Sequence, residues 1–437
     1  MAKTKVVIAG AGLAGLTAAL DLQSKGYHVQ LFEANSFIGG RTASWDIEGM
    51  EVESGLHRIL GFYKEFPRLV RQGGLKMKDV VIWEDELEIK VANGPSGVYG
   101  ASLIFRPFKT LSAPFRNRII SWKDTLRLAR FMTSGLSCYF TNPQKLDTFS
   151  VTEYAKKFNI SNEAQIRILW PFTAGLFFLP PERYSAFVFF SLIAKGIKRP
   201  HRIRVGAFTG GMTEVLANPL AQKIEAQGGQ VYTRHKVQKL VIENNKVTGI
   251  LVNEKFVAAD FVILAVPVGP AQQIIKSSGT EKLNNLLLLP TMPEINLQLE
   301  LSAPAWPVDR TVFGPGTSLI TFAEQSRTTF KGKAGRLSVI LAPPEQFINL
   351  PHEEVFRIFT QEAPFLGIDP SKVVRYRVVS HPRDFYLLSP GVEALKPGTF
   401  TGIPNLFLAG DYIKQPFLAT MEGAIISGRR AAKAVMG

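Results

Sequence analysis

The chain has 437 residues, of which 46% are hydrophobic and 20% charged, and this length and composition suit a globular protein of two or three domains. Its single cysteine, Cys138, excludes an intramolecular disulfide framework, and no uninterrupted apolar stretch reaches the ~18 residues of a membrane-spanning helix. The formal net charge of +15 is compatible with nucleic acid, with an anionic membrane surface or with no specific partner.

The chain begins with a predicted strand, a glycine-rich turn, a helix and a second strand. The apolar run 6–9 leads into Gly10-Ala11-Gly12-Leu13-Ala14-Gly15. A helix is expected over 16–22, and the next apolar strand, 29–32, ends at Glu33. This order of elements, with an acidic residue after the second strand, is typical of a dinucleotide-binding unit.

Each residue type in this unit has a physical role in holding a dinucleotide. Gly10 allows the tight turn, Gly12 lets a pyrophosphate approach the backbone, and Gly15 lets the helix pack close to the strand. The N-terminus of the helix then presents free N–H groups and the positive end of its dipole to the phosphates. Glu33 is expected to hydrogen-bond the ribose hydroxyls.

Two further glycine-containing blocks follow. In Gly39-Gly40-Arg41 the glycine pair lets the backbone approach a ligand closely, and we expect Arg41 to contact a second phosphate. The alternative is an ordinary turn with a solvated arginine. In the second block, His57 lies between Gly55 and Gly61 in a segment without clear periodicity, which indicates a loop against a ligand. A purely structural histidine is the alternative there.

Residues 100–205 combine phenylalanine with basic residues, and the whole chain contains 31 phenylalanines. Aromatic and basic residues adjoin one another in 105–109 and 115–120, and the apolar run 187–195 is followed by basic residues over 198–204. Short apolar helices with basic ends are typical of contacts with a membrane interface. We therefore favour an anionic membrane over nucleic acid as the partner. The alternative is an aromatic core with a solvated basic rim.

The segment 206–270 predicts a helix and then a strand meander. The helix is expected over 215–227, and Asn244-Asn245 marks a hairpin turn. The apolar strand 260–265 can rejoin the N-terminal parallel sheet, which would make that sheet discontinuous in sequence. Strand-like runs such as 295–301 indicate a separate substrate domain after it.

The C-terminal segment contains a predicted strand, 405–409, that leads into Gly410-Asp411. A carboxylate at the carboxyl end of a parallel strand lies where ligands bind in such sheets. Asp411 suits a polyol chain such as ribitol, and a helix cap is its alternative role. The N-terminus of the helix that begins near Gly423 can stabilise negative charge on a reduced ring.

Together these blocks resemble the flavin amine-oxidase superfamily and, within it, the plant- and cyanobacterial-type carotenoid desaturases that act on phytoene and zeta-carotene. The resemblance is sharpest in the N-terminal fingerprint, in 53–63 and in 408–424. It implies FAD as the cofactor, held by the glycines of the motifs and by the side chains around them. The cofactor-binding residues so predicted are Gly10, Gly12, Ala14, Gly15, Glu33, Ala34, Gly40, Arg41, His57, Arg58, Tyr63, Gly410, Asp411 and Met421.

The sequence departs from these relatives at two places. Arg58 stands where relatives usually carry an apolar residue, so a cofactor contact there would come from its backbone. The block after 208–211 lacks the arginine that phytoene desaturases offer near the flavin. Both departures bear on which substrate is used.

The predicted elements and the resemblance give an α/β fold. A Rossmann-like FAD-binding domain is expected in three parts, 1–95, 206–270 and 396–437. Residues 96–205 are expected to form a helical, basic and Phe-rich region that faces a membrane and admits the substrate. Residues 271–395 are expected to form a mixed α+β substrate domain.

The resemblance implies an FAD-dependent oxidoreductase that desaturates a long apolar polyene at a membrane surface by hydride transfer to the flavin, with a quinone as electron acceptor. We expect a cytoplasmic protein with peripheral membrane contact and no bound metal. No general acid or base is identifiable, and His57 and Glu422 are candidates only because they flank the flavin blocks. The alternatives are an amine oxidase, for which no aromatic cage is visible, a hydroxysqualene-type dehydroxylase, or a flavin-binding lipid isomerase or carrier without net redox turnover.

Overall fold

Five parallel strands form the sheet that carries the glycine-rich turn. The computed structural model describes residues 3–84, 86–100 and 119–437, and this sheet has the order β10-β2-β1-β14-β20. Its strands are β1 (Lys5–Ala9), β2 (His28–Phe32), β10 (Gln230–Tyr232), β14 (Phe261–Leu264) and β20 (Leu406–Leu408). β14 pairs in parallel with β1, and β20 pairs in parallel with β14. The predicted return of the chain to the N-terminal sheet after Asp260 is therefore confirmed.

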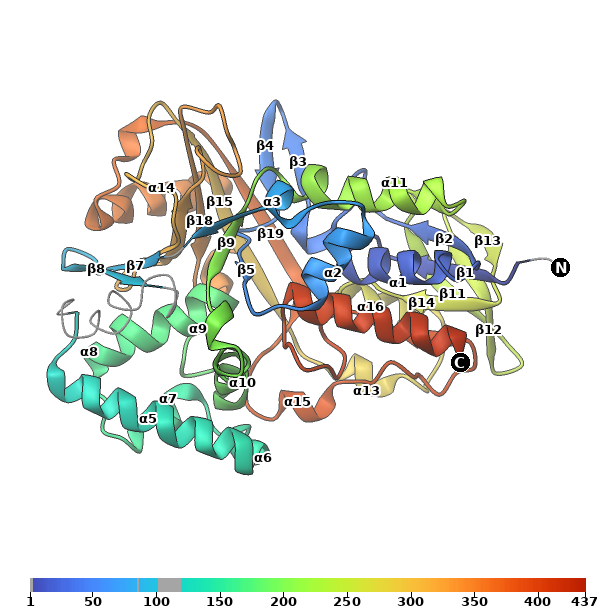
Figure 1. Ribbon diagram of the computed structural model, residues 1–437, viewed down its shortest axis with the longest axis horizontal. Helices are drawn as coiled ribbons and strands as arrows, with labels where there is room; N and C mark the ends of the chain where they lie inside the picture. Colours follow the sequence, from blue (N-terminus) through green and yellow to red (C-terminus); the bar gives the residue numbers. More distant parts are fainter. Residues whose placement is uncertain (1–2, 85, 101–118) are drawn as a thin grey trace.

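Both faces of this sheet are covered, which explains why its strands are apolar throughout. Val6 and Ile8 of β1 pack in the cluster beneath the helices, whereas Val7 and Ala9 pack in the cluster beneath the meander. The helical face carries α1 (Leu13–Gln23), α11 (Asn218–Ala226) and α16 (Met421–Met436). The other face carries β11 (Val237–Glu243), β12 (Lys246–Val252), β13 (Lys255–Ala258) and α12 (Val268–Ser277). Both chain termini lie at this end of the molecule (Figure 1).

The turn between β11 and β12 is the predicted hairpin. Asn244 and Asn245 have φ angles of 48° and 62°, which are the left-handed values that a two-residue turn between antiparallel strands requires at both central positions. The turn between β12 and β13 has the same left-handed conformation at both central residues, with Asn253 and Glu254 at φ angles of 45° and 63°. Asparagine tolerates this conformation better than most residues do.

A seven-stranded sheet, with the order β19-β15-β18-β17-β16-β7-β8, forms the other end of the molecule. One face of β15 packs against α14, and Ile295, Leu297 and Leu299 belong to that core. β7, which precedes the predicted boundary at residue 95, and β8, which follows it, both join this sheet. Its elements are β7 (Glu86–Lys90), β8 (Ser96–Gly100), β15 (Thr291–Leu301), β16 (Val312–Phe313), β17 (Leu319–Glu324), β18 (Gly335–Leu341), β19 (Val373–Tyr386) and α14 (His352–Glu362).

A helical region lies beside this second sheet (Figure 1). It comprises α5 (Trp122–Thr141), α6 (Pro143–Leu146), α7 (Val151–Lys156), α8 (Asn162–Ala164), α9 (Trp170–Phe177) and α10 (Ala186–Ile197). Phe131, Phe189 and Phe190 are buried, with ring centroids 5.1–6.0 Å apart. The aromatic side chains of this region therefore supply a core as well as a surface. The aromatic and basic runs 105–109 and 115–118 lie outside the described residues.

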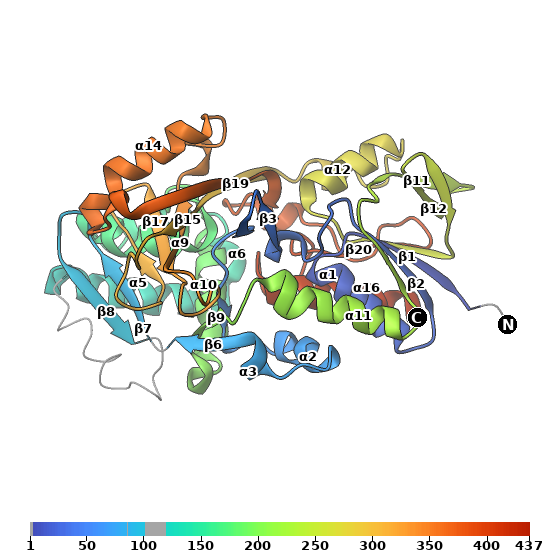
Figure 2. The same ribbon diagram turned by 90° about the horizontal axis from the view of Figure 1, so that it is seen from above.

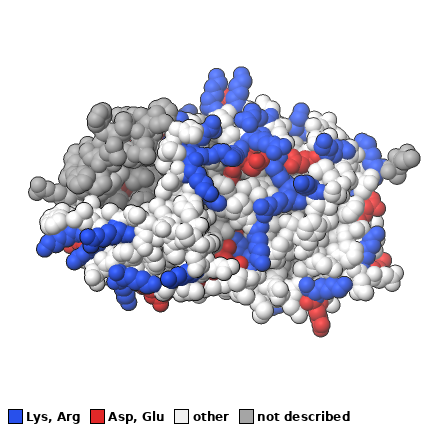
Figure 3. Space-filling view, turned by 60° about the horizontal axis from the view of Figure 1, so that its bottom comes forward, with Lys and Arg blue, Asp and Glu red and all other residues white. Residues whose placement is uncertain are grey.

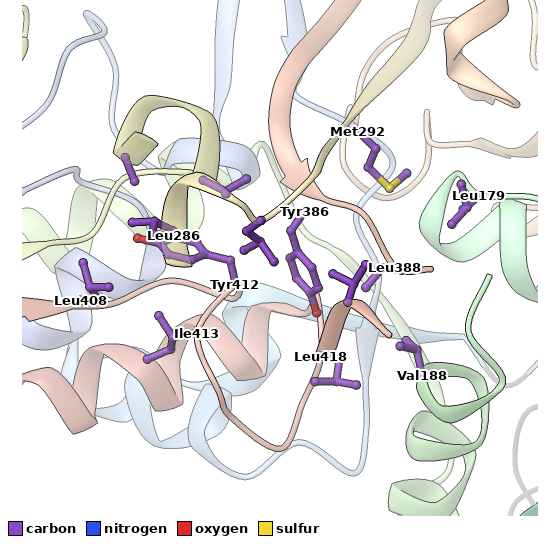
Figure 4. Packing of buried hydrophobic residues seen from close by; sticks show 14 of the residues in the cluster. Leu179, Val188, Leu286, Met292, Tyr386, Leu388, Leu408, Tyr412, Ile413 and Leu418 are labelled. Atoms are coloured by element: carbon purple, nitrogen blue, oxygen red, sulfur yellow. The ribbon is translucent and has the colours of Figure 1, made fainter. Parts of the chain in front are cut away.

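The two ends meet through smaller elements and one long strand. β19 extends from the seven-stranded sheet toward α12 of the parallel-sheet end (Figure 2). At the junction, Tyr386 of β19 and Met292 of β15 pack with Tyr412 and Leu418 from the C-terminal segment (Figure 4). The remaining elements are β3 (Ser44–Ile47), β4 (Met50–Glu53), β5 (Ile59–Leu60), α2 (Glu65–Gln72), α3 (Met77–Val80), β6 (Val81–Glu84), β9 (Val205–Phe208), α13 (Asn284–Leu287) and α15 (Val392–Leu395).

Within the described ranges, no helix combines the length and the apolar character needed to cross a bilayer.

Candidate active site

A cavity of about 1060 Å³ lies where the N-terminal segment, the second sheet and the C-terminal segment meet. Its walls bring together residues that are more than 400 positions apart in sequence, such as Gly10 and Met421. All of the predicted cofactor-binding residues line it except Gly15. Those that line it are Gly10, Gly12, Ala14, Glu33, Ala34, Gly40, Arg41, His57, Arg58, Tyr63, Gly410, Asp411 and Met421.

The glycines of the first turn differ in what surrounds them. A Cβ atom on Gly15 would lie 1.9 Å from the carbonyl oxygen of Gly10, so Gly15 permits the close packing of α1 on the turn. Gly10 has a φ angle of +101°, which favours glycine. At Gly12 the nearest atom to an added Cβ is the Cα of Gly40, at 3.8 Å. The chain therefore leaves room at Gly12, on the cavity wall at the uncapped N-terminus of α1.

Glu33 at the end of β2 is buried, and its carboxylate accepts hydrogen bonds from two backbone N–H groups. Ala11 donates to Oε2 at 2.9 Å, and Asn35 donates to Oε1 at 2.9 Å. The side chain of Asn35 also donates to Oε1, at 3.1 Å. Glu33 thus fixes the glycine-rich turn from the neighbouring strand, and it still lines the cavity.

Arg41 and Asp411, which the sequence assigns to different parts of a ligand, form an ion pair with each other. The Nη1 atom of Arg41 donates to Oδ2 of Asp411 at 3.2 Å, and Nη2 donates to Oδ1. The guanidinium also lies 4.6 Å from the ring centroid of Phe385. The pair closes the cavity wall between the N-terminal and C-terminal segments.

His57 and Arg58 are held by other parts of the chain. The Nε2–H group of His57 donates to the carbonyl oxygen of Arg41 at 2.8 Å, and burial lowers the pKa of His57 to about 4. The guanidinium of Arg58 donates to Thr311 at 3.0 Å and pairs with Glu84 at 3.2 Å. His57 is therefore neutral at physiological pH, and the charge of Arg58 is balanced by Glu84.

Glu422, the other candidate acid or base, does not line the cavity. Its carboxylate accepts three backbone N–H groups at the start of α2, from Lys64 at 2.6 Å, Glu65 at 2.8 Å and Phe66 at 2.9 Å. These bonds tie α16 to α2. They give Glu422 a structural role in place of proton transfer.

A group of polar residues on the cavity wall was missed by the sequence analysis. Glu294 of β15 and His381 and Asp384 of β19 all line the cavity. His381 Nδ1 lies 3.1 Å from Asp384, and its Nε2 donates to the carbonyl oxygen of Ser54 at 3.0 Å. Burial raises the pKa of Glu294 to about 7. Burial works to lower the pKa of His381, but the carboxylates of Asp384 and Glu294 outweigh it and raise that pKa.

Glu294 begins a buried chain of hydrogen bonds along the inner face of the second sheet. Asn296 donates to Glu294 at 3.0 Å, and Gln298 donates to Asn296 at 2.8 Å. Ser338 contacts both Gln298 and Gln325. Gln325 donates at 3.3 Å to Glu53 of β4, so the chain ends at a second carboxyl group.

The sequence signal for this face is the alternation of apolar and polar residues in 294–300. Such alternation normally predicts a strand with one face in water. Here the polar face is covered by the segment 51–58, and Asn296 and Gln298 are fully buried. The covering segment comes from a distant part of the chain, so single-strand periodicity could not indicate it.

The fold and the cavity agree with a family match that spans nearly the whole chain. Residues 13–436 match the family described as flavin containing amine oxidoreductase, and the chain belongs to this family. It is therefore an FAD-dependent oxidoreductase, as the sequence predicts.

Two curated relatives are similar to this chain over almost its whole length. The chain is 25% identical to the 15-cis-phytoene desaturase of Synechococcus elongatus, with 99% of this chain and 96% of the relative covered. It is 28% identical to the zeta-carotene desaturase of Synechocystis, with 99% and 97% covered. In overall fold it is similar to a putrescine oxidase structure, with a TM-score of 0.77, 19% identity, and 100% and 99% of the two chains covered.

The residues present fit FAD. The cavity volume of about 1060 Å³ lies at the upper end of the roughly 300–1,000 Å³ range of common ligand pockets, as a large ligand requires. Gly12 leaves its Cβ position open beside the N-terminus of α1, where a pyrophosphate is favoured. Glu33 and Asp411, which are predicted to contact the sugar and polyol hydroxyls, both line the cavity.

Proposed function

We propose that the enzyme desaturates a long apolar polyene, a carotenoid precursor such as phytoene or zeta-carotene, at a membrane surface. The observation that carries the proposal is the full-length similarity to two desaturases of this substrate class. The apolar side chains on the cavity wall support it. They include Leu56, Leu60, Leu176, Phe177, Phe178, Leu192, Ile340, Val378, Phe385 and Leu388.

The protein contributes mainly by positioning and by excluding water. When bound, FAD supplies a two-electron acceptor for the hydride lost by the substrate. The apolar wall formed by α9, α10 and the second sheet holds a polyene without hydrogen bonds and keeps its reacting carbons fixed. Arg41 and Asp411 hold the N-terminal and C-terminal walls together. A quinone is the proposed final electron acceptor, because it shares the membrane with the substrate.

Membrane contact is assigned to the outer surface of the helical region. On α5, Trp122 is 69% exposed, Leu126 is 53% exposed and Phe140 is 51% exposed. Lys123 and Arg130 of the same helix are also exposed. On the face shown in Figure 3, basic side chains are more numerous than acidic ones. An apolar helix surface with basic neighbours binds the interface of an anionic membrane, so we propose a cytoplasmic protein with peripheral membrane contact.

A second candidate function is amine oxidation, which two carboxyl groups on the cavity wall favour. Glu294 and Asp384 could balance a cationic substrate. The mainly apolar remainder of the wall and the desaturase relatives favour the polyene.

The test is incubation of the FAD-loaded protein with liposomes that contain phytoene or zeta-carotene and a quinone. Extracted products are separated and their absorbance spectra are recorded, with putrescine and hydroxysqualene as parallel substrates. The proposal expects a polyene with a longer conjugated system and an equivalent amount of reduced quinone. Oxidation of the amine, dehydroxylation of hydroxysqualene, or an isomerised polyene without quinone reduction would contradict it.

A further inference from the structure

Glu294 has a buried carboxyl oxygen without a hydrogen bond in the part of the chain that the structure describes. Its side chain lines the cavity, and the residue is only 1% exposed. Oε1 accepts a hydrogen bond from Asn296 at 3.0 Å, whereas Oε2 has no partner among the residues that the structure describes. Leaving a carboxylate oxygen buried without a partner is costly. A proton or a molecule in the cavity can complete this site.

The other carboxyl groups on the wall are already engaged. Both oxygens of Glu33 accept backbone N–H groups, and Asp411 is paired with Arg41. Asp384 bonds to His381. Glu294 therefore differs from them in having a buried oxygen without a hydrogen-bond partner among the described residues.

Two titratable groups continue from Glu294 along β19. His381 Nε2 lies 3.9 Å from Oε2 of Glu294, and His381 Nδ1 lies 3.1 Å from Asp384. The side chain of Asp384 is 25% exposed, compared with 2% for Glu294. The row Glu294, His381 and Asp384 thus leads from a buried carboxyl group to one in contact with water.

We propose that Glu294 is a catalytic residue, the base that accepts the proton lost from the substrate as the new double bond forms; this rests on the proposed function. One C–H bond of the substrate breaks with its electron pair, which leaves as hydride to the oxidised flavin. As the hydride leaves, the neighbouring C–H bond loses its proton to the Glu294 carboxylate in the same step, and its electron pair forms the new carbon–carbon π bond. A quinone would reoxidise the bound flavin by taking up two electrons and two protons, which together equal the hydride and the proton lost by the substrate.

The environment of Glu294 suits this role. Burial raises its pKa to about 7, so near neutral pH the group can both accept and release a proton. The titratable and charged groups around it are His381 and Asp384 on β19 and His57 in the loop after β4. His57 stays neutral because burial lowers its pKa to about 4, so it competes poorly for the proton.

The test compares Glu294→Gln with Glu53→Gln in the FAD-loaded protein. Glu53 is a matched control because it is also 1% exposed, its pKa is also raised to about 7 by burial, and it does not line the cavity. The first readout needs no substrate. Infrared pH titration is expected to show three carboxyl bands with midpoints near pH 7, from Glu53, Glu294 and Glu422, and each variant is expected to remove the band of its own residue.

The second readout is the rate of anaerobic flavin reduction by a liposomal polyene as a function of pH. The wild-type rate is expected to rise with pH through about 7, as Glu294 loses its proton. Glu294→Gln is expected to lower the rate by about 10²–10⁴-fold and to remove this rise. Glu53→Gln is expected to keep the wild-type profile.

Two results would overturn the assignment of Glu294 while leaving the proposed function intact. One is the absence of a titrating band that Glu294→Gln removes. The other is a Glu294→Gln variant that reduces flavin with the wild-type rate and pH profile. If the wild-type protein desaturates no polyene although the Glu294 band titrates, the proposed function fails and the base assignment fails with it.

Discussion

Arg41 and Asp411 are 370 positions apart in sequence and form an ion pair on the cavity wall. The carboxylate is 4% exposed and the guanidinium 19% exposed, so water screens the pair only in part. Removing either partner leaves a poorly solvated charge. Arg41→Gln and Asp411→Asn are each expected to lower the free energy of unfolding by about 1.5–3 kcal/mol and to reduce the flavin content of the purified protein.

A double-mutant cycle by urea unfolding checks this pair. Because each single variant already breaks the pair, the double variant should lose less stability than the sum of the two single variants. Additive losses would show that Arg41 and Asp411 stabilise the fold independently.

Gly12 and Gly15 are expected to respond differently to alanine. At Gly12 an added Cβ has no protein atom closer than 3.8 Å, so Gly12→Ala should fold normally but bind FAD roughly tenfold or more weakly, which is ~1.4 kcal/mol or more. At Gly15 the added Cβ would lie 1.9 Å from a backbone oxygen, so Gly15→Ala should lose about 1–3 kcal/mol of stability or more. Circular dichroism and flavin fluorescence measure both effects. If Gly12→Ala and Gly15→Ala lose flavin and stability to the same extent, the separate roles of the two glycines are contradicted.

Glu53 gives the fold a pH dependence of defined sign. Burial raises its pKa from 4.5 to about 7, so the folded protein holds this proton more tightly than the unfolded chain does. The contribution of Glu53 to stability therefore falls as pH rises from about 4.5 to about 7, by ~1.4 kcal/mol per pH unit at most. Relative to wild type, Glu53→Gln should be more resistant to urea at pH 8 than at pH 5. The same relative resistance at both pH values would contradict a raised pKa of Glu53 in the folded protein.

Membrane contact through α5 is tested by exchanging exposed apolar side chains for polar ones. Trp122→Gln combined with Leu126→Gln should weaken sedimentation with anionic liposomes, because both side chains are more than half exposed on one helix. Phe256→Gln on β13 is the control, since Phe256 is 55% exposed at the parallel-sheet end. If Phe256→Gln weakens liposome sedimentation equally, or if the α5 substitutions have no effect on it, α5 does not form the membrane contact.

Local patterns were enough to predict the parallel sheet and its turns. The run 6–9 before Gly10 and the strand that leads to Gly410 are apolar and end at residues that mark a ligand-facing edge. Asn244-Asn245 predicted its hairpin because few residue types accept the required φ angles. In these cases the sequence signal and the structural cause lie within the same few residues.

The polar wall of the cavity could not be predicted in that way. The alternation in 294–300 predicts that Glu294 faces solvent, but distant parts of the chain, such as Gly55 and His381, lie against it and bury it. Glu422 is a candidate acid or base in the sequence because it flanks a predicted flavin block, but backbone N–H groups at the start of α2 occupy its carboxylate. The pairing of Arg41 with Asp411 likewise depends on a contact between distant segments.

The most direct test of polyene desaturation is a single anaerobic turnover. The oxidised, FAD-loaded protein is mixed with liposomes that contain phytoene or zeta-carotene and no electron acceptor, and the visible absorbance of the flavin is followed. The proposed function predicts bleaching of the flavin together with one new carbon–carbon double bond in the extracted polyene for each flavin reduced. A flavin that stays oxidised with both polyenes and is bleached by an amine would contradict it.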